Sequence, residues 1–123
     1  MDLSRYSAES QEIFRFAEEE ALTLRHGQIG THHLLIALIR VGAFPGDARE
    51  ARLAVREATF ELEPRIEDLP ETIPFSFGSR QFLDRAEELA GDAVVTPEHL
   101  AESMRRQSGH VVSVLHRMGI FLY

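Results

Sequence analysis

The sequence predicts an all-α fold built from two similar helical units packed together as one globule. Three observations predict it: apolar residues recur with helical spacing along most of the chain, the helical pattern occurs twice, and no alternating strand pattern of any length is present. Hydrophobic residues make up 44% of the 123 residues, which is enough for a core.

The internal repeat is visible when the chain is shifted by 69 residues. Ser7 then meets Ser76, and Ser10 meets Ser79. At a shift of 66, His33 falls on His99. The later helices match at a shift of 60, where Ala51, Ala54, Val55 and Ala58 fall on Val111, Val114, Leu115 and Met118. We therefore predict a single domain over 1–123, with repeat one at about 3–69, a linker at about 70–75 and repeat two at about 76–123.

Repeat one contains three clear helices and a short fourth one. Ser7 is a suitable N-cap for the first helix, and Thr31 for the second. The third helix is expected at about 47–58, after a loop rich in Gly and Pro. Pro64 can begin a short fourth helix, which Pro70 stops.

Repeat two follows the same order. Ser76 or Ser79 caps a helix that ends near Ala90. Thr96-Pro97-Glu98 has the features of a helix start, with a cap, a proline at the first position and an acid near the positive helix end. The last helix is expected from Val111 to Met118. We expect no fourth helix in repeat two.

Composition excludes several functions. The chain has no Cys, so thiol catalysis and zinc–thiolate sites are excluded. All 13 basic residues are Arg, and without a Lys there is no ordinary P-loop and no Schiff base. A net charge of −7 argues against nucleic acid as a partner. No segment predicts a membrane span or a signal peptide, so we expect a cytoplasmic protein.

An aromatic–hydroxyl step opens each repeat, at Tyr6-Ser7 and at Phe75-Ser76. The second helix of each repeat opens with a shared motif, at 30–35 and at 96–100. These paired motifs resemble the N-terminal domain of Clp ATPases, the double Clp repeat that precedes the ATPase rings of AAA+ unfoldases, in which the second helix opens with Gly-Thr-Glu-His-Leu-Leu. No ATPase module follows, so we expect a stand-alone protein or an excised domain.

The resemblance implies binding of adaptors, unfolded substrates and, in some members, arginine-phosphorylated proteins. Carried over by position, the residues for phosphoarginine are Ser7 and His32 in repeat one, and Ser76 and Glu98 in repeat two. His32 replaces the family's acidic residue and cannot pair with a guanidinium as a carboxylate does. We therefore expect at most one working site, in repeat two.

The resulting hypothesis is a non-enzymatic protein-binding module of the Clp system, whose partners are protein substrates, adaptors or a Clp ATPase. The alternative is an accessory subunit that docks on a Clp complex and regulates or stabilises it. The sequence leaves a homodimer open. It predicts no cofactor and no catalytic residue. It also predicts no metal site, because the adjacent pair His32-His33 has no acid or cysteine at a matching spacing.

For the same residues a purely structural role is the simpler interpretation. Ser7, Thr31, Ser76 and Thr96 are first of all helix caps. His33 and His99 are expected to hold helices together through hydrogen bonds in the core. The acidic runs at 18–20 and 87–88 are expected to be solvated helix faces.

Overall fold

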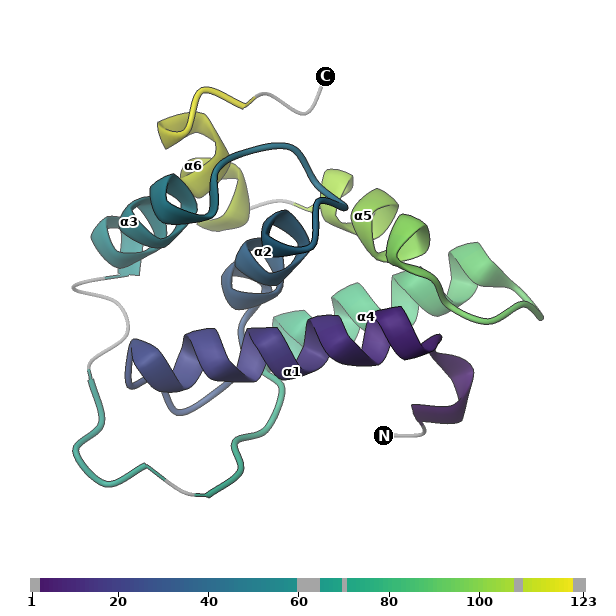
Figure 1. Cartoon of the computed structure of the whole chain (residues 1–123), viewed down its shortest axis with the longest axis horizontal. Helices are drawn as coiled ribbons and strands as arrows, with labels where there is room; N and C mark the ends of the chain where they lie inside the picture. Colours follow the sequence, from purple (N-terminus) through teal and green to yellow (C-terminus); the bar gives the residue numbers. More distant parts are fainter. Residues whose placement is uncertain (1–2, 60–64, 70, 108–109, 121–123) are drawn as a thin grey trace.

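The computed structural model describes residues 3–59, 65–69, 71–107 and 110–120, without the side chain of His110. Within these ranges the protein is all-helical, as predicted, and contains no strand beyond two isolated β-bridges. A 3₁₀ turn at Leu3–Arg5 precedes the helices, which are α1 (Ala8–Thr23), α2 (Thr31–Arg40), α3 (Ala48–Thr59), α4 (Phe77–Ala90), α5 (Pro97–Arg105) and α6 (His110–Arg117) (Figure 1).

Helix α2 lies at the centre of the fold, and every other α-helix packs against it (Figure 1). Its residues 32–39 are all buried, so this helix is enclosed around its whole circumference. The first two helices of each repeat pack as a pair, α1 with α2 and α4 with α5. The third helices of the two repeats, α3 and α6, pack against each other.

The two repeats are joined by a crosswise pairing of the segments that precede their helices. A parallel bridge links Tyr6, just before α1, to Val95, just before α5. A second parallel bridge links Ile29, just before α2, to Phe75, just before α4. Each repeat therefore places the start of its first helix beside the start of the other repeat's second helix.

The helix boundaries agree with the sequence expectations except at a few points. The N-cap of α2 is Gly30, and Thr31 is its first helical residue. The last helix runs from His110 to Arg117. Residues 65–69, within the expected short fourth helix, are not helical; Pro64 and Pro70 lie outside the described residues. Arg25, which has a φ of 58°, holds this segment: its guanidinium donates to the carbonyls of Ile66 and Glu67.

The acidic run at 18–20 is only partly a solvated face, because Glu19 is exposed and Glu20 is buried. Glu20 is 3% exposed, and its carboxylate accepts two bonds of 2.9 Å from Nε of Arg52 and one of 2.7 Å from Nη2. Arg40 approaches the same carboxylate at 3.2 Å, and its guanidinium lies 4.1 Å from the ring centre of Phe16. Because these residues come from α1, α2 and α3, the ion cluster ties together the three helices of repeat one.

No helix among the described residues combines the length and the apolar character needed to cross a membrane.

Candidate functional site

Ser7 lies at the junction between α1 and the start of α5. Its Oγ accepts from the backbone N–H of Ser10 at 3.1 Å and so caps α1. Its own N–H donates to the carbonyl of Val95 at 3.0 Å, and the hydroxyl of Ser10 donates to the same carbonyl at 2.8 Å. These bonds place Ser7 beside the segment that leads into Thr96 and Glu98.

Ser76 occupies the equivalent junction between α4 and the start of α2. Its Oγ accepts from the N–H of Ser79 at 3.1 Å. Its N–H donates to the carbonyl of Ile29 at 2.9 Å, and the hydroxyl of Ser79 donates to that carbonyl at 2.7 Å. Ser76 therefore adjoins the segment that leads into His32.

The pairing of candidate residues within each repeat is wrong. We expected Ser7 with His32 and Ser76 with Glu98, because positions were carried over one repeat at a time. The structure instead brings Ser7 toward the helix of Glu98, and Ser76 toward the helix of His32, through the two β-bridges. A sequence alignment of the two halves cannot show this exchange, since it contains no information on how the halves pack.

The two junctions also differ in how open they are. Glu98 is exposed to solvent in the first turn of α5. His32 is only 7% exposed, and its ring lies close to Gly30. A Cβ at Gly30 would come within 2.5 Å of the His32 ring, so the glycine leaves the room that this ring occupies. The junction of Ser7 with Glu98 thus presents an accessible carboxylate, whereas that of Ser76 with His32 does not present its imidazole.

His32 belongs to a buried cluster of three imidazoles that the sequence analysis missed. His26 follows α1, and His33 is the third residue of α2. Nδ1 of His26 lies 2.8 Å from Nε2 of His33, and the rings of His32 and His33 have their centres 4.1 Å apart. The signal in the sequence was the seven-residue spacing between His26 and His33 across the turn that joins two adjacent helices.

His33 also completes the start of its helix, as predicted for a structural histidine. The N–H of Gly30 donates to Nδ1 of His33 at 2.8 Å. The equivalent bond in repeat two runs from the N–H of Thr96 to Nδ1 of His99, at 3.0 Å. Burial is the main cause that lowers the pKa of His33, and the neighbouring His32 and His26 lower it further. His33 is therefore neutral in the folded protein.

The hydrogen bonds of His33 decide how well the cluster suits a metal ion. The three rings offer nitrogen atoms within 4.8 Å of one another, a spacing that could hold a metal. However, Nδ1 of His33 accepts from Gly30, so the ring's proton must lie on Nε2 and be donated to His26. A metal would need the lone pair of that Nε2, and the cap at Gly30 would then be lost or the ring doubly deprotonated. The donor chemistry favours a hydrogen-bonded structural cluster.

Tyr6 ties α4 to the seam between the repeats, by which we mean the two β-bridges Tyr6–Val95 and Ile29–Phe75 and the hydrogen bonds beside them. Its hydroxyl donates to Oε2 of Glu87 at 2.8 Å, and burial, followed by this bond, raises the pKa of Tyr6. Arg5 lies 3.7 Å from the same carboxylate and donates to the carbonyl of Gly91 at 2.7 Å. These contacts join the segment before α1 to α4 and to the turn that follows it.

Comparison with known families identifies the repeated unit. The model of the Clp repeat (R) N-terminal domain matches residues 5–118. The chain belongs to this Clp repeat family. In general, the N-terminal domains of Clp proteins mediate protein or adaptor binding and are not themselves catalytic.

Individual relatives are much longer than this chain. The negative regulator of genetic competence ClpC/MecB of Bacillus subtilis is 29% identical over 133 aligned positions, which cover 99% of this chain and 16% of that protein. The chaperone protein ClpB of Oceanobacillus iheyensis is 25% identical, with the same coverage. The chain thus spans about a sixth of the length of these relatives.

Solved structures show the same fold. The N-terminal domain of the caseinolytic protease associated chaperone ClpD from Arabidopsis thaliana superposes with a TM-score of 0.78 at 22% identity, covering 98% of this chain and 92% of that one. The N-terminal domain of Hsp104 from Candida albicans gives 0.73 at 17% identity, with coverages of 95% and 83%.

Proposed function

We propose that this Clp repeat chain is a non-catalytic module that captures protein substrates or adaptors for a Clp-type machine in the cytoplasm, and that its binding site is the open junction of Ser7 and Glu98. The observation that carries the proposal is the seam. The bond from Ser7 to Val95 joins the N-terminus of the 16-residue helix α1 to the segment that leads into α5, and the first turn of α5 contains the exposed Glu98.

The chemistry of this junction suits an arginine-phosphorylated side chain in part. A carboxylate such as Glu98 can accept two charge-assisted bonds from a guanidinium. The first-turn backbone amides of α1, at Ala8 and Glu9, have no acceptor within the helix and can donate to a phosphate. The carboxylate of Glu9 in that same turn opposes an anion. We therefore expect one weak phosphoarginine site at this junction.

The junction of Ser76 with His32 is not proposed as a second site. His32 is buried against Gly30 and His33, so it would have to leave the core to reach a ligand. The first turn of α4 contains no acidic residue, so nothing there replaces the carboxylate that a guanidinium needs.

Calorimetric titration with an arginine-phosphorylated peptide and its unmodified twin tests the proposal. Binding of the phosphorylated peptide alone, lost in Glu98→Ala and strengthened in Glu9→Gln, would support phosphoarginine recognition at this junction. Ser76→Ala is the matched control and should leave binding unchanged. If Ser76→Ala and not Glu98→Ala removed binding, the site would be the other junction. Failure of both peptides and of every Clp substrate and adaptor would overturn the proposed function.

The alternative, docking on a Clp complex as an accessory subunit, is supported by one surface feature. Leu53 on α3 is 56% exposed and lines a hollow of about 270 Å³ between α3 and α6, with Glu50, Glu57 and Met118. An exposed leucine over a hollow is a reasonable protein contact. Co-migration with a Clp ATPase in the absence of substrate, lost in Leu53→Gln, would favour this role. Co-migration that Leu53→Gln leaves intact would place the docking surface elsewhere.

A further inference from the structure

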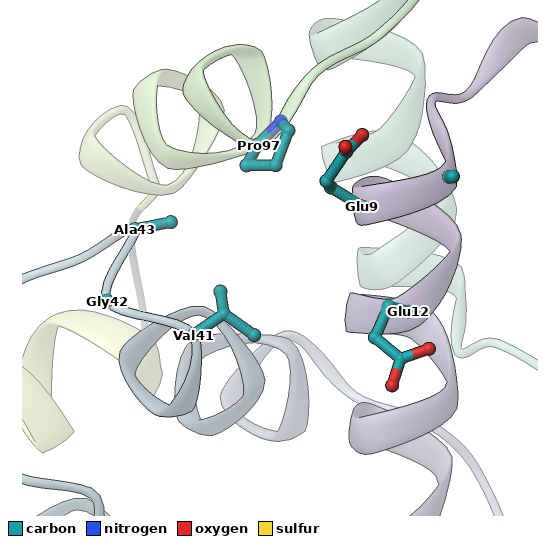
Figure 2. A pocket seen from close by; sticks show the side chains of 7 residues that line it. Glu9, Glu12, Val41, Gly42, Ala43 and Pro97 are labelled. Atoms are coloured by element: carbon teal, nitrogen blue, oxygen red, sulfur yellow. The ribbon is translucent and has the colours of Figure 1, made fainter.

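A groove lies between the first two turns of α1, the end of α2 and the start of α5. Its volume is about 460 Å³, and its walls include Ala8, Glu9, Glu12, Val41, Ala43 and Pro97. In Figure 2 the two glutamates project from one helix, Val41 points into the gap from the facing helix, and Pro97 closes a third side. The groove adjoins the Ser7 junction, because Ala8 follows Ser7 and Pro97 precedes Glu98.

The lining combines apolar walls with carboxylates, and the described residues that form it include no cation. Val41 is 41% exposed, which is unusual for an apolar residue at the end of the central helix. Glu12 pairs with Arg15 at 3.0 Å, but that arginine side chain is 76% exposed and is not part of the lining. Glu9 forms no ion pair with any described residue. The groove therefore favours a ligand that is apolar and positively charged.

The groove is unsuited to an anion for a second reason. Pro97 is the first residue of α5 and has no backbone N–H, so this helix start lacks one of the donors that a phosphate would use. Glu9 and Glu12 would repel a phosphate directly. The phosphorylated ligand considered for the Ser7 junction and the ligand of this groove are therefore chemically different.

A hollow in repeat two overlaps the position of this groove and is lined differently. There a hollow of about 230 Å³ lies between α4 and the end of α5, lined by Gln81, Arg85, Arg106 and Gln107. Gln81 occupies the position of Glu12, and Gln107 that of Val41. The two hollows correspond at these two positions, and there repeat two has two neutral amides in place of a carboxylate and a valine.

We propose that the groove binds a protein segment in which a leucine-like apolar side chain adjoins an unmodified arginine or lysine. The apolar side chain packs on Val41, Ala43 and Pro97, and the cation lies against Glu9 and Glu12. This deepens the proposed function by naming the chemistry of a bound segment, and it rests on that function. It involves residues other than Glu98, so the two sites can be separated.

Fluorescence anisotropy with three labelled peptides tests the proposal. The peptides carry Leu-Arg, Leu-Glu or Ser-Arg in the same flexible Gly/Ser frame. We expect the Leu-Arg peptide to bind at least about tenfold more tightly than either twin, since each twin lacks one of the two contacts. Equal binding of the three peptides, or no binding of Leu-Arg at millimolar concentration, would overturn the proposal.

Variants identify where the peptide binds. Glu9→Gln with Glu12→Gln should weaken the Leu-Arg peptide about three- to tenfold and reduce its salt dependence. Val41→Gln, which introduces the repeat-two residue, should weaken it by a similar factor. Gln81→Ala is the matched control in the other hollow and should change nothing. Unchanged binding in both groove variants would place the peptide elsewhere and overturn the assignment.

Failure of the groove proposal can be distinguished from failure of the proposed function. If Glu98-dependent capture of a phosphorylated peptide or a Clp substrate persists while the three labelled peptides bind alike, only the groove proposal fails. If no peptide, substrate or adaptor binds, both fail.

Discussion

The two repeats of this protein agree in their helix starts and differ in what surrounds them. Ser7 and Ser76 cap their helices with the same bond lengths, and Ser10 and Ser79 donate to equivalent carbonyls of the opposite repeat. The differences are concentrated in three places: the ion cluster at Glu20, the histidine cluster at His33, and the groove beside α1. The shared bonds maintain the fold, so residues outside them are free to differ between the repeats.

The ion cluster is the clearest structural difference. Leu89 stands at the repeat-two position of Glu20, and Val112 at that of Arg52. Repeat one therefore joins its helices with a buried carboxylate and two arginines, whereas repeat two has apolar side chains at two of these positions. The same helix arrangement can be held by either chemistry.

The largest effect is expected from Glu20→Ala. The substitution leaves Arg52 and Arg40 without their shared carboxylate and opens a cavity at a position that is 3% exposed. Breaking a buried ion pair costs about 3–5 kcal/mol, and partial exposure of the arginines reduces this to about 2–4 kcal/mol. Urea denaturation followed by circular dichroism measures the loss.

A double variant tests whether the charge itself is needed. Glu20→Leu with Arg52→Val inserts the repeat-two residues, and it should restore most of the stability lost in Glu20→Ala, because apolar replacements of buried ion pairs are often neutral. If the double variant is as unstable as Glu20→Ala, the ion cluster is required and the comparison between repeats fails at this point.

The second prediction uses the histidine cluster, which has no counterpart around His99. His33 is neutral when folded because burial lowers its pKa, whereas in the unfolded chain it takes up a proton below about pH 6.5. Its contribution to stability is therefore complete above that pH. As the pH falls, the contribution decreases by about 1.4 kcal/mol per unit, because the unfolded state binds one more proton.

His33→Asn isolates this effect. The asparagine oxygen can still accept from Gly30 but does not titrate. The difference in unfolding free energy between wild type and variant should therefore shrink as the pH falls from about 6.5, the unperturbed histidine pKa, to about 5. Denaturation curves at several pH values measure the gap. A gap that stays constant would contradict a neutral, buried His33.

Much of the fold was predictable because its determinants are local. Caps such as Ser7, Ser76 and Thr96 are recognised from a few neighbouring residues, and the apolar spacing locates the helices. Residues 65–69 are not helical, and Arg25, far away in the sequence, binds the carbonyls of Ile66 and Glu67 there. Local propensity contained no sign of this contact.

The site was predicted only in part. The resemblance selected Ser7, His32, Ser76 and Glu98, and whether they bind a ligand stays a prediction. Their pairing depends on the two β-bridges between repeats, which no local pattern indicates. The burial of His32 likewise depends on the missing side chain at Gly30 and on His26 from the preceding turn. Such features arise from packing and become visible only in three dimensions.

A smaller effect is expected at the shared seam. Ser10→Ala removes the hydroxyl that donates to Val95, and Ser79→Ala removes the one that donates to Ile29. Each carbonyl keeps its bond from a backbone N–H, so each variant should lose about 1 kcal/mol of unfolding free energy. The two losses should be nearly equal. Thermal and urea denaturation compare the two. If the stability losses of the two variants differed by more than about 1 kcal/mol, the two halves of the seam would be energetically unequal despite their similar bond lengths.

The smallest effect is expected where α3 meets α6. Nη1 of Arg117 lies 3.2 Å from Oε2 of Glu57, but both side chains are about half exposed. An exposed pair of this kind contributes about 0–0.5 kcal/mol, so Arg117→Ala should barely change the urea midpoint at low or high salt. The two helices are held instead by Val55, Val114 and Leu115, which are fully buried. A loss above about 1 kcal/mol, removed by salt, would mean that charge rather than burial joins the third helices of the two repeats.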